Sequence, residues 1–272
     1  MENIILYAII GLTIFISMRG FSDLNFFERF LFSTFAIKRQ KEFIRFVSSG
    51  FLHADWFHLG MNMFVLYSFG SNVIIAGWDK FLVLYTASLL GGNVLSYIVN
   101  ASRSEDYKAI GASGAVSGIV FASIAINPQS EIMFLLLPIP IPAWIYGIAY
   151  IAYSIFGMSK KYDNIGHEAH LGGAITGLLL TLAYYPMLFV LEPLIIGLLL
   201  GVSVLVLLGI IFQPQLFGMA PRYTLTRAEE YSLVNEWNYL ADKANRLGEH
   251  ALSEREKLRM KEIDKKLKKP FF

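Results

Sequence analysis

Residues 169–186 read AHLGGAITGLLLTLAYYP, an apolar run that contains His170 near its start and, four positions apart, Gly173 and Gly177. A helix of about 20 mostly apolar residues can cross a lipid bilayer, where water cannot satisfy backbone polar groups. Glycines four positions apart let such a helix approach a neighbouring helix closely. The stretch therefore predicts a membrane-spanning helix that packs tightly and carries a polar side chain near one end.

The composition of the whole chain agrees with residence in a membrane. Of the 272 residues, 55% are hydrophobic and 16% are charged, and the mean hydropathy is +0.52. Soluble globular domains carry about 25% charged residues. Residues 222–272 hold 12 of the 23 Lys and Arg residues and 9 of the 21 Asp and Glu residues, which predicts a soluble tail. The chain has no Cys, which excludes disulfides, thiol catalysis and Cys-based zinc sites.

Seven apolar stretches are predicted to span the membrane. They are residues 3–18, 58–76, 81–99, 112–127, 142–157, 169–186 and 194–212. The predicted fold class is all-α, with a polytopic bundle in residues 1–213 and a short helical hairpin in residues 222–272. Between the first two stretches, residues 19–57 mix aromatic with basic side chains, a pattern typical of helices that lie in the plane of the bilayer interface.

Two further patterns predict local structure outside the apolar stretches. The proline-rich run at residues 138–144 is excluded from a helix interior, because proline lacks a backbone donor and disfavours helix in the residue before it. This run predicts a tight, stiff turn. The tail is predicted to form two helices, because it holds two pairs with capping-box spacing, Thr226 with Glu229 and Ser253 with Glu256.

Polar side chains are costly inside a bilayer, so the polar residues that occur in the predicted spans are candidate functional residues. Four of them stand out: His58, Asn62, Ser113 and His170. If the helices alternate in direction, all four lie toward the same face of the membrane. His58 and Asn62 are four residues apart, which places them on one helical face. The sequence therefore predicts a single polar pocket.

Ser113 and His170 predict nucleophilic catalysis within that pocket. Ser113 follows Gly111 closely and lies at the start of a predicted helix, whose free amide groups could hold an oxyanion. An imidazole such as that of His170 can take the serine proton and return it to a leaving amine. No third carboxylate is evident, so the prediction is a Ser–His dyad.

Each of these features also has a simpler interpretation. Gly114 and Gly118 suit a packing face, and a polar residue in a span can serve interhelical hydrogen bonding or a proton path. His167 and His170 suggest a metal pair, but they lack the spacing of zinc-protease helices, and no third ligand is evident. Residues 111–115 imitate the Gly-x-Ser-x-Gly hydrolase elbow, but the fifth position is Ala and no strand is predicted before it.

Together the motifs resemble those of the rhomboid family, over about residues 45–177. The matching pieces are His53-x4-His58-x3-Asn62, Gly111-Ala-Ser113-Gly114 and Ala169-His170-x-x-Gly173-x-x-x-Gly177. The resemblance implies a six-helix transmembrane bundle, here with an added seventh span at residues 194–212. It implies an intramembrane serine endopeptidase that cleaves transmembrane protein substrates in the lipid bilayer. No cofactor, metal or nucleic acid is expected, and the expected location is a bacterial inner membrane.

The resemblance also assigns roles to individual residues. Ser113 is implied as the nucleophile and His170 as its only catalytic partner. His58 and Asn62 are implied to help bind the oxyanion, and Gly111 is assigned to the same oxyanion and substrate-binding group. Two other classes stay open, namely an inactive relative that binds transmembrane helices and a transporter. Transporters usually show inverted repeats, which this sequence does not display.

Three positions depart from the family's pattern. Ile44 and Arg45 stand where the interfacial loop usually has Trp-Arg, Ile74 replaces a common Glu, and Ser117 replaces an aromatic residue often found near the catalytic His. None of these changes touches the dyad, so activity is expected with altered stability or substrate range. Ser117 is also a candidate nucleophile, one helical turn deeper along the same helix. Ser113 is preferred because it lies at the helix terminus, where the backbone amides are free.

Overall fold

The computed structural model describes residues 3–75, 77–101, 105–134, 137–160, 165–217 and 227–267. These residues are nearly all α-helical, with two short two-stranded sheets, so the all-α prediction is confirmed in its coarse form. The chain separates into two compact units. One comprises residues 1–101 with 107–219, and the other comprises residues 102–106 with 220–272.

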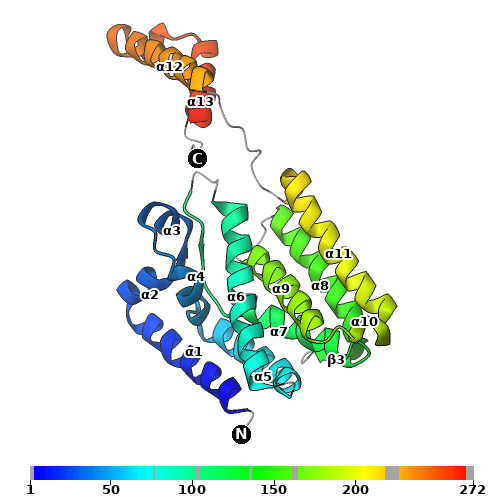
Figure 1. The fold of residues 1–272 in the computed structure, drawn as a ribbon. Coiled ribbons are helices and arrows are strands. Elements are labelled where there is room, and N and C mark those ends of the chain that lie inside the picture. Colours follow the sequence, from blue (N-terminus) through cyan, green and yellow to red (C-terminus); the bar gives the residue numbers. More distant parts are fainter. Residues whose placement is uncertain are drawn as a thin grey trace. The chain divides into compact units, whose positions relative to one another are not determined.

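Long helices make up most of the first unit (Figure 1). They are α1 (Ile4–Ser22), α5 (Trp56–Ile74), α6 (Trp78–Asn100), α7 (Ser113–Ile126), α8 (Ala143–Lys160), α9 (His167–Tyr184) and α11 (Pro193–Phe212). Each overlaps one of the predicted spans. Among the described residues, α1, α6 and α11 are long and apolar enough to cross a membrane, and α7 and α8 are shorter apolar helices. The first unit is thus compatible with a membrane bundle, while the count of seven spans stays a prediction.

The segment between α1 and α5 folds into short helices. They are α2 (Leu24–Phe30), α3 (Thr34–Gln40), α4 (Arg45–Ser48) and the 3-10 helix η1 (Ser49–Phe51). Within this segment, β1 (Phe32–Ser33) pairs antiparallel with β2 (Lys108–Ala109). The pairing attaches the segment to the residues that lead into Ser113.

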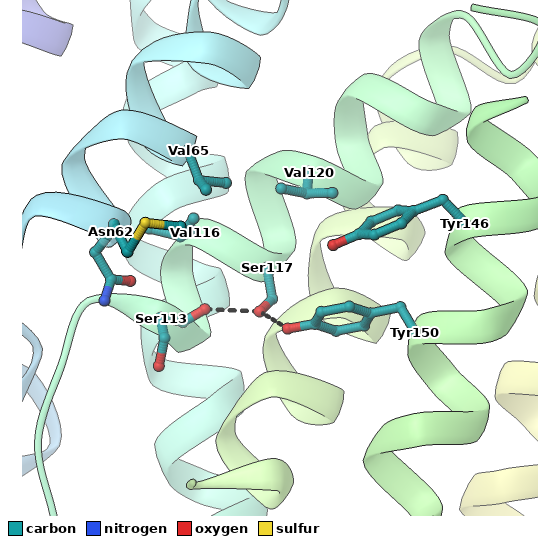
Figure 2. Close-up of a pocket in the computed structure, with 9 residues that line it drawn as sticks. Asn62, Val65, Ser113, Val116, Ser117, Val120, Tyr146 and Tyr150 are labelled. Carbon is teal, nitrogen blue, oxygen red and sulfur yellow. Dashed lines mark hydrogen bonds between the residues drawn. The ribbon is translucent and has the colours of Figure 1, made fainter. Parts of the chain in front are cut away.

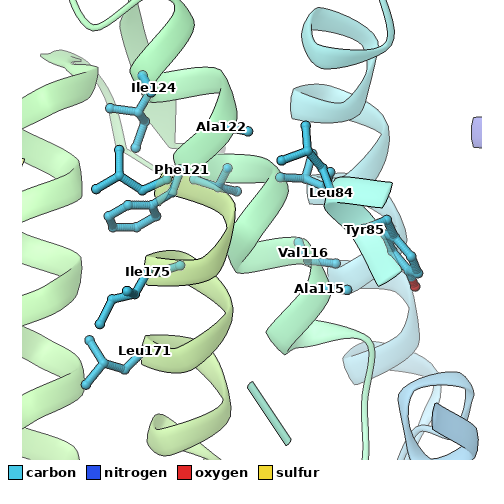
Figure 3. Packing of buried hydrophobic residues seen from close by; sticks show 14 of the residues in the cluster. Leu84, Tyr85, Ala115, Val116, Phe121, Ala122, Ile124, Leu171 and Ile175 are labelled. Carbon is cyan, nitrogen blue, oxygen red and sulfur yellow. The ribbon is translucent and has the colours of Figure 1, made fainter. Parts of the chain in front are cut away.

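Helix α7 lies at the centre of the first unit. It contacts α5, α6, α8 and α9, and every residue from Gly114 to Ala125 is buried. A helix that is apolar all round is expected to be buried on all sides. Figure 3 shows α7 side chains between neighbouring helices, with Ala115 on the side of Tyr85 from α6 and Phe121 near Ile175 from α9. Ser113, the first residue of α7, is therefore anchored to the core.

Glycines bring the backbones of α7 and α9 into contact. A methyl group on Gly173 would overlap the carbonyl oxygen of Gly114, and one on Gly177 would overlap the carbonyl oxygen of Gly118. Close packing of this kind needs small residues, because a side chain would push the helices apart. The packing interpretation of these glycines is confirmed, and the contact fixes the ends of α7 and α9 that carry Ser113 and His170.

The proline-rich run differs from its prediction. Strand β3 (Glu131–Phe134) pairs antiparallel with β4 (Leu137–Pro142), with Ile132 opposite Ile141. The three prolines lie outside any helix as expected, but the prediction of a tight turn at residues 138–144 is wrong, because residues 138–142 form an extended strand and Ala143 and Trp144 begin α8. The fixed backbone angle of proline is compatible with an extended edge strand, where the missing donor is tolerated.

Two short elements complete the first unit. Helix α10 (Leu188–Leu191) connects α9 to α11, and the 3-10 helix η2 (Pro214–Phe217) follows α11. The ring of Phe217 is buried and lies against Gly209, so η2 packs back onto α11.

The second unit contains two helices, as predicted. They are α12 (Arg227–Leu247) and α13 (Glu254–Leu267), joined by the 3-10 helix η3 (Glu249–Ala251). The capping box of α13 is confirmed, because the Glu256 amide donates to Ser253 Oγ at 3.3 Å and the Ser253 amide donates to Glu256 Oε2 at 2.8 Å. Thr226, from the other predicted capping box, lies outside the described residues.

Candidate active site

The backbone before Ser113 has an unusual conformation that only glycine adopts easily. Gly111 has φ of +119°, in the region that side chains disfavour. A Cβ at this position would lie 3.0 Å from two ring atoms of His58 and 3.7 Å from Ser113 Oγ. Gly111 therefore lies against both groups, and it allows the His58 ring and the Ser113 hydroxyl to face the same small space.

Hydrogen bonds from the segment between α1 and α5 hold this backbone in place. The Gly111 amide donates to the carbonyl of Ser49 at 3.0 Å, and the Ala112 amide donates to His53 Nε2 at 3.3 Å. His53 is fully buried and its Nδ1 lies 3.0 Å from Ser17 Oγ. These contacts fix the residues on the amino-terminal side of Ser113.

The protonation state of His53 follows from its partners. Burial, aided by repulsion from His58, lowers the pKa of His53 from its ordinary 6.5 to about 3, so the ring is neutral near pH 7. Nε2 accepts from the Ala112 amide, so the ring proton lies on Nδ1 and is donated to Ser17 Oγ. Ser17 in turn donates to the carbonyl of Phe51 at 2.9 Å. His53 is thus a structural residue that links α1 to the start of α7.

His58 and Asn62 lie in the first turns of α5. Asp55 caps this helix by accepting from the His58 amide at 2.8 Å, and the Ala54 amide approaches His58 Nδ1 at 3.4 Å. A neutral His58 therefore carries its proton on Nε2, which is one of the two ring atoms nearest Gly111. The side-chain amide of Asn62 donates to the His58 carbonyl at 3.0 Å. Both residues thus lie beside the Ser113 position, as the sequence predicts.

A cavity of about 170 Å³ opens beside Ser113 (Figure 2). Helices α5, α7 and α8 line it with Met61, Asn62, Val65, Ser113, Val116, Ser117, Val120, Tyr146 and Tyr150. Six of these nine side chains are aliphatic or aromatic, and the polar groups are those of Asn62, Ser113, Ser117 and the two tyrosine hydroxyls. This combination is typical of a ligand site, where apolar walls enclose a small number of polar groups.

His170 lies in the first turn of α9, beside the start of α7. A Cβ on Gly114 would lie 3.2 Å from the carbonyl oxygen of Ala169, so the residues adjoining Ser113 and His170 are in contact. The imidazole ring of His170 lies 6.2 Å from the ring of Tyr150, at an interplanar angle of 28°. It also meets the ring of His167 edge-on at 6.2 Å. The structure therefore brings the predicted nucleophile and the predicted base to the same end of the α7–α9 pair.

The neighbouring carboxylate on α9 belongs to a separate buried cluster. Glu168 accepts from Asn100 Nδ2 at 3.3 Å and from the Tyr107 hydroxyl at 3.5 Å. Among the described residues no three potential ligands converge on a metal site. The expectation of a metal-free site stays a prediction.

Comparison with known proteins places these residues in a family. A family model described as Rhomboid domain matches residues 40–187, which is more than half of the chain and includes His58, Ser113 and His170. The chain belongs to the rhomboid family. Rhomboid proteins act on transmembrane proteins within the lipid bilayer.

Three curated relatives illustrate the match. Rhomboid protein 1, mitochondrial, from Saccharomyces cerevisiae is 30% identical over 182 residues, which cover 64% of this chain and 51% of the relative. Presenilin-associated rhomboid-like protein, mitochondrial, from Homo sapiens is 32% identical over 132 residues, covering 48% of this chain and 35% of the relative. RHOMBOID-like protein 12, mitochondrial, from Arabidopsis thaliana is 33% identical over 146 residues, covering 47% of this chain and 42% of the relative. The chain spans about half or less of the length of these relatives.

The names of these relatives correct one expectation. All three are described as mitochondrial, whereas the sequence motifs were expected to belong to a protein of a bacterial inner membrane. The comparisons point away from a bacterial cell membrane, and that expectation is wrong. The motifs themselves carry no information on compartment, because they report only the geometry of the site.

The positions that depart from the usual rhomboid pattern have clear surroundings in this chain. Arg45 is buried and donates to the carbonyls of Glu28 at 3.0 Å and Leu31 at 2.6 Å, so it ties α4 to α2 without a preceding Trp. Ile44 is exposed, and Ile74 is buried in the apolar core where a Glu is common. These substitutions lie away from the cavity.

Ser117, the third departure, is committed to hydrogen bonds. Its Oγ donates to the Ser113 carbonyl at 2.7 Å and lies 2.5 Å from the Tyr150 hydroxyl. A hydroxyl held in this way is a poorer candidate nucleophile than Ser113, which lies at the helix terminus. The sequence reasoning missed Tyr150 and the structural role of His53. His53 belongs to a recognised motif, so the sequence marked the residue but not its role. Tyr150 had no sequence signal beyond being an aromatic residue in an apolar helix.

Proposed function

We propose that this rhomboid protein is an intramembrane serine endopeptidase that uses Ser113 and His170. The observation that carries the proposal is the position of Ser113, at the free end of a buried helix, facing a cavity shared with Asn62 and beside the His58 ring. His170 lies in the first turn of α9, whose backbone touches α7 directly after Ser113. A nucleophile, a base and potential oxyanion donors thus lie at one end of the bundle.

The chemistry follows from these groups. Ser113 Oγ attacks the carbonyl carbon of the scissile peptide while its proton passes to the imidazole of His170. The carbonyl oxygen becomes an oxyanion, which the amide groups at the start of α7, the Nε2 proton of His58 and the Asn62 amide stabilise. When the peptide bond breaks, the leaving amine takes the proton from His170. A water molecule, activated by the same imidazole, then hydrolyses the acyl ester and restores Ser113.

The membrane arrangement of the proposal uses all seven predicted spans. Helices α1, α5, α6, α7, α8, α9 and α11 cross or enter the bilayer, and residues 222–272 form a soluble tail. The substrate's transmembrane helix enters beside α8, the fifth span, and its end unwinds near the surface. Unwinding is required because the carbonyl of a helical residue is already hydrogen-bonded and shielded.

The test is the replacement Ser113→Ala in the full chain, assayed on a model transmembrane substrate in detergent micelles. We expect the variant to insert and fold, because the start of α7 is held by Gly111 and Ala112, but to lose cleavage and fluorophosphonate labelling. Ser117→Ala is the matched control, and it should keep the labelling that Ser113→Ala loses. Cleavage that persists in Ser113→Ala contradicts the assignment. If the wild-type protein is neither labelled nor active, the alternative of an inactive rhomboid relative that binds transmembrane helices is favoured.

A further inference from the structure

Tyr150 of α8 stacks on the imidazole of His170. The two ring centroids are 6.2 Å apart and the planes differ by 28°, close to the parallel arrangement in which aromatic faces attract. Ser113 belongs to α7 and His170 to α9, whereas this ring comes from a third helix. The candidate site therefore includes a contribution from α8 that the motifs do not contain.

The hydroxyl of Tyr150 is fixed at the other end of the ring (Figure 2). It lies 2.5 Å from Ser117 Oγ, which also lies 2.7 Å from the Ser113 carbonyl. A carbonyl oxygen only accepts hydrogen bonds, so Ser117 donates to Ser113 and Tyr150 donates to Ser117. Two bonds in series thus connect the Tyr150 ring to the backbone of the nucleophile.

Other rings support this arrangement from both sides. Tyr150 packs against Tyr146 at 5.8 Å and Phe121 at 5.7 Å between centroids. His167 meets His170 edge-on, with ring centroids 6.2 Å apart, and Tyr153 in turn meets His167 at 5.1 Å between centroids. The imidazole of His170 therefore contacts two other rings, and the ring of Tyr150 itself packs against two more.

We propose that Tyr150 is a positioning residue that sets the plane of the His170 imidazole, and that Ser117 locks Tyr150 in place. This inference rests on the proposed function and adds α8 to the machinery of the site. It also accounts for Ser117, because a small side chain at this position leaves room for the Tyr150 ring and supplies a hydroxyl to hold it. A general base must keep its orientation, since small displacements of a catalytic group slow the reaction strongly.

The first test separates the ring of Tyr150 from its hydroxyl. In Tyr150→Leu, which removes both, we expect kcat for a model transmembrane substrate to fall about 100-fold, with KM changed much less. In Tyr150→Phe, which keeps the ring, we expect a loss of only about fivefold, the size expected from one net hydrogen bond. Partial rescue by Phe distinguishes stacking on His170 from a general packing role. Wild-type kcat in Tyr150→Leu overturns the inference.

The second test examines the hydrogen bond by which Ser117 holds Tyr150 in place. Ser117→Ala removes the same hydroxyl contact from the other side, so we expect a similar fivefold loss in kcat. The double variant Ser117→Ala with Tyr150→Phe should be no slower than Ser117→Ala alone, because both changes delete the same bond between Tyr150 and Ser117. If the losses in kcat of the two single variants multiply in the double variant, Ser117 does not act by holding Tyr150. This test remains decisive even if Tyr150→Leu fails to fold.

The controls separate this inference from the proposed function. Tyr67→Leu removes a ring from α5 that is exposed and stacked on Tyr7, so it should keep wild-type kcat. Wild-type protein that neither cleaves substrate nor reacts with fluorophosphonate overturns the proposed function and the inference together. Active wild-type protein with an equally active Tyr150→Leu variant overturns the role of Tyr150 alone.

Discussion

Gly111 shows how much a single residue can determine near the nucleophile. Its positive φ angle turns the chain into α7, and the absence of a side chain lets the His58 ring lie beside Ser113. The sequence motif predicts a glycine here for close approach, but it does not reveal the neighbour. Only the fold shows that His58, from a helix about 50 positions earlier, is what a Cβ would strike.

His53 is the residue whose role the sequence predicted least. It belongs to the same motif as His58, yet its ring is buried and bridges Ser17 to the Ala112 amide. Spacing alone cannot separate the histidine beside Gly111 from the one that supports the backbone, because the two are only five residues apart near the start of α5. The distinction comes from burial and from the hydrogen-bond partners.

This environment makes the stability of the protein depend on the charge of His53. Its pKa is about 3 in the folded chain, below the ordinary 6.5, so between these values the unfolded chain binds a proton that the folded chain does not. The titration of His53 therefore leaves the free energy of unfolding unchanged above pH 6.5 and lowers it as the pH falls from 6.5 toward 3. We expect the thermal midpoint of the detergent-solubilised protein to fall between pH 7.5 and pH 4.5.

The matched variant for this prediction is His53→Gln. Its side-chain oxygen can accept from the Ala112 amide, and it does not titrate. Carboxylates elsewhere titrate equally in both proteins, so the variant should show a smaller drop in thermal midpoint over the same pH range. Equal drops in the two proteins would contradict the assignment of this pH dependence to His53.

At the scale of elements, the glycines between α7 and α9 are the most sharply constrained contacts. Gly177 faces the backbone of α7 at Gly118, whereas nothing lies within 4 Å of a Cβ built on Gly197 of α11. In Gly177→Ala the helices must separate, and overpacking of this kind costs about 1–3 kcal/mol. We expect a lower thermal midpoint and a loss of cleavage, because Ser113 and His170 lie on the two helices that move apart.

Gly197→Ala is the control for that prediction. Alanine has the higher helix propensity, by about 1 kcal/mol in exposed helix interiors, and no neighbour is displaced. The thermal midpoint should be unchanged or slightly higher, with full activity. If both variants lose the same stability, the loss is not specific to the contact between α7 and α9, and that contact does not explain the result.

The helices and strands also show what the sequence could and could not predict. Apolar runs located every long helix of the first unit, because lipid-compatible helices depend on length and composition. The run at residues 138–142 was predicted as a turn, since proline signals exclude helix but do not distinguish a turn from an edge strand. Tyr150 escaped notice because its partner His170 is contributed by another helix, and contacts between helices leave no spacing in the sequence.

At the scale of the whole molecule, the described site lies entirely in the first unit. Every residue that lines the cavity, and His58 and His170, precedes residue 219. Phe217 is buried against Gly209, so residues after 213 take part in the packing of the first unit. We expect a chain that ends after residue 219 to retain fluorophosphonate labelling at Ser113. A chain that ends after residue 213 should have a lower thermal midpoint, because Phe217 is missing.

Loss of labelling in the longer truncation would show that the tail contributes to the site. Ser113→Ala in the truncated chain provides the background for this measurement. The second unit has its own apolar contacts, formed by buried Leu233, Leu240, Leu252 and Ile263. It also has its own ion pair, in which Arg259 donates to both oxygens of Glu236. Its removal should therefore leave the packing of the first unit intact.

The cavity beside Ser113 bears on the last step of the proposed reaction, the hydrolysis of the acyl ester. Its volume of about 170 Å³ leaves room for several solvent molecules at once, each of which takes up about 30 Å³ in the liquid. In the proposed reaction, the acyl ester would therefore form beside a space large enough to hold the water that hydrolyses it. We therefore expect a compact nucleophile that enters this space, such as hydroxylamine, to compete with water for the same ester in the proposed reaction.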